Sequence, residues 1–294
     1  MKMKKRFLAV VLMVLLGSSL LISGCTQSGE NSESRGRVHI VYVEWVCGSA
    51  STHVIADVLQ NIMGYDVELT PVSVALMFEA LAQGEADFTT VASRPVMHAA
   101  YLERIADRVV DVGSHLRGVE LGLVVPAYVE INSVEELNSI RNELNGEMIG
   151  IDPGAGMMIH AQKLIEEYEL DLVLLEGSDA TMTAALHAAI LQNRPIVALG
   201  WRPHWKFSRW DLKFLDEPKQ IFGASENYHV VARVGLQEDM PEVFELLQNF
   251  SWSMEDIESA IMMAEDSGSS VQAASDWVAQ NRELVNSWLP EAFR

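Results

Sequence analysis

The stretch Val38-His39-Ile40-Val41-Tyr42-Val43 is a short run of mostly β-branched and aromatic residues, which is typical of a buried strand. Apolar residues at helical spacing follow from Ser49 to Gly64 and predict a helix. A strand at 66–70, a helix at 74–83 and a short strand at 86–90 come next. Because strands and helices alternate in this way, the sequence predicts an α/β protein with parallel sheets.

The same alternation begins again in the second half of the chain. A long apolar strand is expected at 119–126, and a second strand-turn-helix unit starts at Met148-Ile149-Gly150-Ile151. The strand from His229 to Val234 leads into a helical segment, 241–288, which we expect to return to the first lobe. The resulting prediction is a first lobe of residues 37–121 plus 230–294 and a second lobe of residues 122–229.

The N-terminus has the pattern of an export signal. Basic residues precede the apolar run Phe7 to Leu16, and Leu21-Ile22-Ser23-Gly24-Cys25 resembles a bacterial or archaeal lipobox, where cleavage leaves a cysteine to be lipidated. We therefore expect a signal peptide at 1–24 and a lipidated Cys25 that anchors the protein extracytoplasmically to the cell membrane. A flexible, polar leash is expected over 25–36. The alternative for Cys25 is an ordinary spacer cysteine.

The net charge excludes several partners. The chain has 21 Lys plus Arg and 41 Asp plus Glu, a formal net charge of −20. Residues 1–24 hold four basic residues and no acidic ones, so their removal leaves 21 − 4 = 17 basic residues against 41 acidic ones, or −24. Such a surface disfavours nucleic acid and anionic phosphate ligands. If Cys25 carries lipid, Cys47 has no partner for a disulfide.

Four segments of the chain resemble a known family. They are Tyr42-Val43-Glu44-Trp45, Gly150-Ile151-Asp152-Pro153-Gly154-Ala155-Gly156-Met157-Met158, Gly177-Ser178-Asp179-Ala180-Thr181-Met182 and Gly200-Trp201-Arg202-Pro203-His204-Trp205. In this order they resemble the substrate-binding proteins of glycine betaine and proline betaine ABC importers, over essentially the whole mature chain. The Gly-Trp-x-Pro-His-Trp segment is the most specific of the four.

The resemblance implies a two-lobed periplasmic-binding-protein fold (type II). Each lobe would be a mainly parallel sheet flanked by helices, with the ligand enclosed in the cleft between the lobes. In that family tryptophans from both lobes form a cage around the trimethylammonium group, while backbone amides and a histidine or other donor hold the carboxylate. A quaternary ammonium has no N–H to donate, so aromatic faces recognise it, whereas helix N-termini recognise a carboxylate.

The expected function follows from the resemblance. The protein would be an extracytoplasmic receptor that delivers glycine betaine, or a related quaternary-ammonium osmolyte, to a membrane permease and its ATPase. It would be a monomer that performs no catalysis and needs no cofactor. The eight histidines are scattered without metal-ligand spacing, so we expect no metal site either.

The resemblance also implies roles for particular residues. For the cation cage it points to Trp45 and Trp201, which we expect at the carboxyl ends of strands, facing the cleft. The alternative for each is a buried core aromatic. The candidates for the carboxylate are the amides of Gly48 and Ser49 and the side chains of His204 and His229.

The chain departs from the family at one wall of the cage. Family members often carry a tryptophan in an Asp-x-Trp-x-Pro-x-x-His pattern, where this chain has Val91-Ala92-Ser93-Arg94-Pro95-Val96-Met97-His98. Either the cage lacks this wall or another aromatic replaces it, and Tyr228 is the candidate for that replacement. Ser93, Arg94 and Cys47 are further candidates for the pocket, with purely structural roles as the alternative for Arg94 and Cys47.

Other functions remain open at this point. The same fold could bind choline, carnitine, ectoine, a sulfonium osmolyte or an amino acid. An exported hydrolase is a lesser alternative, since the chain has neither a Gly-x-Ser-x-Gly elbow nor a nucleotide-binding loop. A lipoprotein that signals or scaffolds without a solute would not need tryptophans in a cleft.

Overall fold

The computed structural model describes residues 34–294. The predicted signal peptide, the lipidated Cys25 and the leash as far as Glu33 lie outside the described residues. Of the predicted leash, Arg35 is described, and its guanidinium pairs with Glu242 at 2.7 Å.

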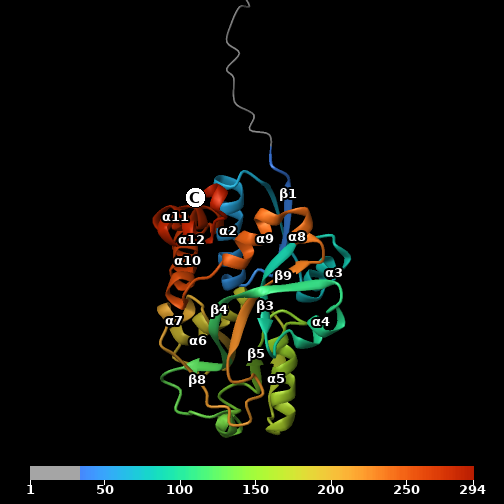
Figure 1. Cartoon of the computed structure of the whole chain (residues 1–294). Helices are drawn as coiled ribbons and strands as arrows, with labels where there is room; N and C mark the ends of the chain where they lie inside the picture. The colour runs from blue at the N-terminus through green and yellow to red at the C-terminus, as the bar shows by residue number, and fades with distance from the viewer. Residues whose placement is uncertain (1–33) are drawn as a thin grey trace, which may run out of the picture. The chain divides into compact units, whose positions relative to one another are not determined.

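Nine strands make up the sheets of the described residues (Figure 1). They are β1 (Arg37–Tyr42), β2 (Asp66–Pro71), β3 (Phe88–Arg94), β4 (Val109–Pro126), β5 (Glu147–Ile149), β6 (Val173–Leu175), β7 (Ala198–Arg202), β8 (Leu212–Phe214) and β9 (Glu226–Arg233). The strand order is β2-β1-β3-β9-β4-β7-β5-β6, and β8 pairs with β4.

The strand directions are more mixed than the sequence suggests. Strand β1 is parallel to β2 and β3, and β5 is parallel to β6 and β7. However, β9 is antiparallel to β3 and β4, and β4 is antiparallel to β7 and β8. The α/β architecture is as predicted, and the pairing within the sheets is mixed, because β4, which connects the lobes, and β9 run antiparallel to their neighbours.

The long strand β4 connects the two lobes. From Val109 to Val119 it pairs with β9 in the first sheet, and from Glu120 to Pro126 it pairs with β7 and β8 in the second. In Figure 1, β1 and the C-terminal helices lie on one side of this crossing, and β5, β8, α5 and α6 lie on the other. Each lobe thus has its own sheet, and the chain passes between them along β4 and returns before β9.

Helices cover both sheets. The α-helices are α2 (Val46–Asp57), α3 (Val74–Gln83), α4 (Ala99–Arg104), α5 (Gly156–Glu167), α6 (Asp179–Leu191), α7 (Lys206–Arg209), α8 (Leu236–Asp239), α9 (Pro241–Asn249), α10 (Met254–Ser267), α11 (Ser270–Gln280) and α12 (Arg282–Trp288). A π-helical turn, η1 (Val58–Ile62), continues α2, and two 3₁₀ helices are η2 (Val134–Ile140) and η3 (Glu291–Phe293).

Local sequence explains where several helices begin and end. Ser178 and Ser253 each accept a hydrogen bond from the backbone three residues later and so cap α6 and α10. Ser133 caps η2 within a capping box. Helix α3 ends at Gly84, whose φ of 72° is open to glycine at little cost.

The C-terminal helices pack against elements of the first sheet. Helices α10 and α11 pack on α2, and aromatic rings from this segment form a buried cluster. In it Trp277 and Trp288 stack with ring centroids 6.1 Å apart, and Trp252 donates to Nδ1 of His115 on β4 at 3.1 Å. These tryptophans therefore hold the tail to the sheet and do not line a ligand site.

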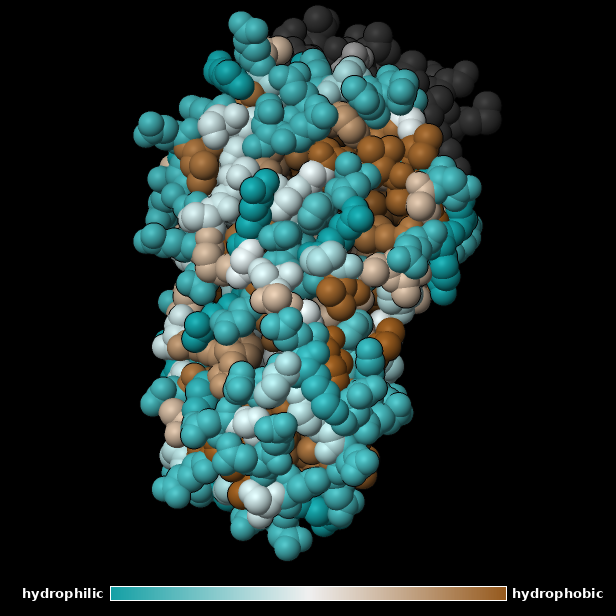
Figure 2. Space-filling model, turned by 60° about the horizontal axis from the view of Figure 1, so that its bottom comes forward, coloured by the Kyte–Doolittle hydropathy of each residue, from teal (hydrophilic) through white to brown (hydrophobic). Residues whose placement is uncertain are grey.

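The surface of the described part is mainly polar. The face drawn in Figure 2 is largely hydrophilic, with smaller hydrophobic areas between, in keeping with the excess of acidic residues. Among residues 34–294, no helix combines the length and apolarity that a membrane span requires.

Candidate ligand-binding site

A pocket lies between the two sheets. Both lobes contribute to its walls, and most of the lining side chains are apolar or aromatic. The lining residues are Trp45, Ser93, Met97, His98, Leu121, Ile151, Ala155, Gly156, Met157, Trp201 and Tyr228. Apolar walls with a few polar groups are typical of a site for a small organic ligand.

Two indole rings reach this cavity from opposite lobes. Trp45 follows β1 in the first lobe, and Trp201 lies in β7 of the second, where it pairs with Leu121. They are 8% and 3% exposed, so water has little access to either ring. The Trp45 indole donates to the carboxylate of Asp152 at 3.0 Å, which fixes its orientation across the gap between the lobes.

Ser93 and Tyr228 form a third wall. They are directly paired across β3 and β9, so their side chains lie on the same face of the sheet. Ser93 donates to Glu226 at 2.9 Å, and the fully buried Glu226 carboxylate also accepts from the amides of Val96 and Met97. This network holds the segment between Ser93 and His98 in place.

The amino end of α5 opens onto the cavity. The first amides of an α-helix have no carbonyl partner within the helix. In the described part of the chain, those of Gly156 and Met157 have no other acceptor either, and the first turn contains no acidic side chain. Gly156 is required here, since a Cβ at this position would lie 2.2 Å from the carbonyl oxygen of Met97. The cavity therefore contains free N–H groups and the positive end of a helix dipole.

His98 adds a further donor beside these amides. Its Nδ1 accepts from the Ser93 amide at 2.9 Å, so the neutral ring carries its proton on Nε2. Burial lowers the pKa of His98 to about 4, which keeps the ring neutral at pH 7. The ring also stacks on Trp45, with centroids 6.1 Å apart. Its Nε2–H is thus a neutral donor next to one of the two indoles.

The structure places the predicted carboxylate residues of α2 elsewhere. The Ser49 amide donates to the carbonyl of Trp45 at 2.7 Å, and Ser49 borders a different hollow, together with Glu44 and Trp205. Gly48 is packed against Val43 and Val91. Neither borders the cavity, because the amino end of α2 already faces a protein carboxylate: the amide of Val46 donates to Asp179 at 3.2 Å.

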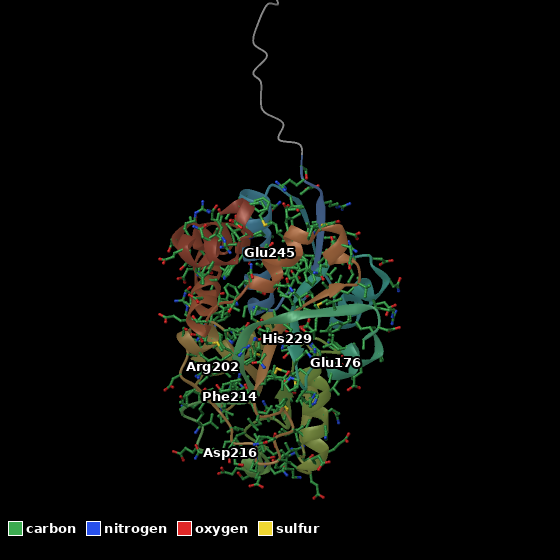
Figure 3. The ribbon with its side chains drawn as sticks, in the orientation of Figure 1. Glu176, Arg202, Phe214, Asp216, His229 and Glu245 are labelled. Atoms are coloured by element: carbon green, nitrogen blue, oxygen red, sulfur yellow. The ribbon has the colours of Figure 1, made fainter. Side chains whose placement is uncertain are left out.

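The two predicted histidines also lie outside the cavity. His204 is buried, accepts from the Lys206 amide through Nδ1, and bonds Asp179 through Nε2 at 2.9 Å. His229 lies beside Tyr228 on β9, and neighbouring side chains of a strand point to opposite faces. Its Nδ1 instead contacts Asp111 at 2.8 Å, near the crossing of β4 and β9 (Figure 3).

Arg94 and Cys47 do not border the cavity either. Arg94 pairs with Asp111 and borders a separate hollow that also includes Pro95 and Leu102. Cys47 is buried behind the cavity wall and donates to the Tyr228 hydroxyl at 3.4 Å. Burial raises the pKa of the Cys47 thiol to about 11, so it stays protonated.

Seven of the eleven lining residues were not among the predicted site residues, and three of the seven, namely His98, Gly156 and Met157, offer hydrogen-bond donors to the pocket. The signals were present. His98 is the histidine of the Asp-x-Trp-x-Pro-x-x-His pattern, which the chain keeps even though Ser93 replaces its tryptophan. Gly156 ends the Gly-Ala-Gly turn and begins α5, and Met157 follows it.

Comparisons with known proteins identify the family of the chain. Residues 36–280 match the family model for the substrate binding domain of the ABC-type glycine betaine transport system. A glycine betaine/carnitine transport binding protein of Listeria monocytogenes is 41% identical over 149 residues, which is 50% of this chain and 50% of that protein. The chain thus matches about half the length of that relative.

Two solved structures are similar over nearly their whole length. The glycine betaine, L-proline ABC transporter binding protein of Borrelia burgdorferi is 35% identical, with 87% of this chain and 98% of that one covered and a TM-score of 0.84. A lactococcal protein in a closed conformation, complexed with glycine betaine, is 33% identical, with 87% and 100% covered and a TM-score of 0.83. The chain therefore belongs to the family of substrate-binding domains of ABC-type glycine betaine transport systems.

Proposed function

We propose that the protein is an extracytoplasmic receptor that binds glycine betaine or a related quaternary-ammonium solute and presents it to the permease and ATPase of an ABC importer. One observation carries this proposal: Trp45 of the first lobe and Trp201 of the second border the same pocket as the free amino end of α5. Membership of a solute-binding family supports a receptor and not an enzyme.

The trimethylammonium group would lie against the two indoles. A quaternary ammonium presents only methyl groups, which suit an apolar wall, and its charge is attracted to the negative faces of the rings. Each such contact contributes roughly 0.5–2 kcal/mol. Tyr228 supplies a third aromatic surface, next to the small Ser93, so the cage can accept a head group somewhat larger than trimethylammonium on that side.

The carboxylate would be held at the start of α5. The amides of Gly156 and Met157 can donate to its oxygens, the helix dipole favours its charge, and Nε2–H of His98 can add a third hydrogen bond. Because all these donors are neutral, the site would complement a zwitterion without burying an extra charge. This observation favours glycine betaine over choline, which has no carboxylate.

Closure of the lobes would bring the two halves of the site together. Hydrogen bonds join the lobes beside the cavity, from Trp45 to Asp152, from Tyr101 to the Gly154 carbonyl at 2.9 Å and from Val46 to Asp179. Opening would break them and expose the ligand. We place the lobe boundaries within the segments where β4 leaves the first sheet and β9 rejoins it.

Anchoring through Cys25 is part of the same proposal. A receptor that feeds a permease benefits from confinement at the membrane surface, and the lipobox-like segment before Cys25 provides the means. Mass spectrometry of the protein isolated from membranes would detect a chain that begins at an acylated Cys25. A chain that retains residues 1–24, or that begins elsewhere without lipid, would contradict the anchor.

The binding function can be tested by following tryptophan fluorescence during titration with glycine betaine, proline betaine, choline, carnitine, dimethylsulfoniopropionate and proline. We expect saturable binding of a betaine that weakens on the order of tenfold or more in Trp45→Ala and in Trp201→Ala. Trp210→Ala is a matched control, since Trp210 stacks on His187 away from the cavity. Equal losses in all three variants, or preference for unmethylated proline, would contradict the proposed cage.

A further inference from the structure

Lys206, the first residue of α7, is buried directly behind the cavity. Its exposed fraction is 0%, and among residues 34–294 it is the single lysine or arginine that the fold buries. Its Nζ lies 3.9 Å from the centroid of the Trp201 ring and has no hydrogen-bond partner in the described part of the chain. Burying an unpaired ammonium costs several kcal/mol of stability. A lysine at this position is therefore a candidate for a functional role.

The position of Lys206 relative to Trp201 suggests that role. Trp201 borders the cavity and Lys206 does not. The lysine therefore covers a part of the indole that faces away from the ligand. A cation in the cavity and an ammonium on Lys206 would then interact with one and the same ring.

Few charges surround this lysine. Asp179 of α6 attracts its ammonium form, while His204 is neutral and Cys47 of α2 is a protonated thiol. The nearby Tyr228 of β9, which contacts Cys47, is protonated as well, since burial raises its pKa well above the ordinary value. Asp179 is itself engaged by His204 and the Val46 amide. Desolvation dominates, and it lowers the pKa of Lys206 to about 7.

We propose that Lys206 determines the affinity of the cage: its ammonium form opposes a quaternary ammonium on Trp201, and cation binding drives the proton off Lys206. This inference rests on the proposed function, because it requires an onium group on Trp201. The leaving proton passes to the solvent, and the product is the neutral amine. The amine leaves the indole free to attract the ligand.

The sign and size of the effect follow from electrostatics. Above the pKa of Lys206 the amine is neutral and the cage binds with full strength. Below it, two cations would lie about 8 Å apart across the ring, which weakens binding on the order of tenfold at an intermediate dielectric. Affinity for any onium ligand therefore falls as the pH drops through about 7, the pKa of Lys206.

Another titratable group in the cavity can be separated from this effect. His98 has a pKa of about 4, and a ligand carboxylate beside it would raise that value and take up protons, never release them. Choline has no carboxylate and so leaves His98 unaffected. If choline and glycine betaine both cause the release of protons, the release therefore comes from the effect of the bound cation on Lys206.

Calorimetry in buffers of different ionisation enthalpy measures this proton release directly. We expect the wild-type protein at about pH 7 to release a fraction of a proton with either ligand. Its affinity should fall on the order of tenfold from about pH 8.5 to about pH 5.5. In Lys206→Met we expect no release and a flat pH profile, with affinity at acidic pH above that of the wild type. Lys163→Met, which removes an exposed lysine, should behave as the wild type does.

The controls keep the inference falsifiable. A thermal melt shows whether Lys206→Met folds, and Lys206→Leu serves as a second variant. Carbon-13 NMR of ε-labelled lysine in the wild-type protein should show one lysine titrating near neutral pH that shifts on choline binding. If onium ligands bind but release no proton, or if Lys206→Met keeps the wild-type pH profile, the inference is overturned. If no onium ligand binds at any pH, the proposed function itself fails.

Discussion

Asp179 engages the amino end of α2 in the same way that we propose a ligand carboxylate engages the amino end of α5. Both helices start next to an aromatic wall of the cavity, and both suit an anion. Sequence alone suggests that a helix start binds the carboxylate, but it offers two helix starts. It does not say that Asp179, more than 100 residues from α2 in sequence, fills one of them. The free pair, Gly156 and Met157, becomes evident only when the lobes are assembled.

The aromatic residues were easier to place from sequence than the polar ones. Trp45 and Trp201 border the cavity because each stands near the end of a strand that points at the gap between the lobes. The histidines are harder, since one residue of displacement along a strand reverses the direction of the side chain, as Tyr228 and His229 show. Burial and the partner Asp111 decide the place of His229, and neither is visible in a single sequence.

Replacement of His98 tests the anion side of the site. In His98→Ala we expect glycine betaine to bind about tenfold more weakly, because a hydrogen bond to a charged group is lost. Choline should lose much less, since it has no carboxylate to place beside His98. The ratio of the two affinities, measured by calorimetry, cancels any general distortion of the loop. His229→Ala is the control, and an equal loss for both ligands in His98→Ala would remove His98 from the carboxylate site.

Helix α5 illustrates how an element builds a binding surface. Its first turn lies so close to Met97 of the other lobe that only glycine fits at position 156. Most strands and helices of the first lobe were predictable from periodicity, and α3 has the predicted limits of 74–83. The antiparallel direction of β9 was not, because it depends on which neighbours the returning strand meets.

A methyl group on Gly156 should weaken ligand binding because it displaces the start of helix α5. In Gly156→Ala the start of α5 must move away from Met97, so we expect glycine betaine affinity to fall more than about tenfold, with a smaller loss of stability. Ala161→Gly, the reverse change in the buried middle of the same helix, should lower stability by roughly 1 kcal/mol and leave affinity unaltered. Titration and urea denaturation of both variants distinguish these results. Intact affinity in Gly156→Ala would show that the α5 amides do not hold the ligand.

At the scale of the whole molecule, the family comparisons confirm the predicted two-lobed fold. The lobe limits, the signal peptide and the lipidated Cys25 stay predictions. Sequence could indicate the fold because strand and helix periodicities and the four family-like segments recur in order along the chain. The contacts that join the lobes are side-chain details, and periodicity carries no information on them.

One of these contacts provides a test of closure. Tyr101→Phe removes the hydrogen bond to the Gly154 carbonyl and should favour the open form, which lowers the affinity several-fold, in line with about 1 kcal/mol for one hydrogen bond. Tyr128→Phe removes a comparable bond, to the Arg194 carbonyl within the second lobe, and should not affect binding. Small-angle scattering with and without ligand would show the change in population. Identical behaviour of both variants would argue against a role for Tyr101 in closure.

Acid should destabilise the whole fold through its buried histidines. Burial lowers the pKa of His98, His115 and His204 to about 4. Below pH 6.5 these histidines therefore become protonated in the unfolded chain while they stay neutral in the folded chain. Stability is then lost as the pH falls from 6.5 to about 4, by several kcal/mol in total. The lowered pKa of Asp179 acts only below its ordinary 3.8, outside this window. Urea denaturation at several pH values measures the slope, and a flat profile between these limits would contradict the assignment of neutral buried histidines.

The most direct test of the central claim is a calorimetric titration with glycine betaine, dimethylglycine, sarcosine and glycine, a series that loses one methyl group at a time and keeps the carboxylate. A cage formed by Trp45 and Trp201 predicts that affinity is highest for the quaternary member and falls with each methyl removed, while the α5 end contributes equally throughout. If glycine bound as tightly as glycine betaine, or if affinity rose as N–H groups appeared, the aromatic cage would not be what the cavity provides.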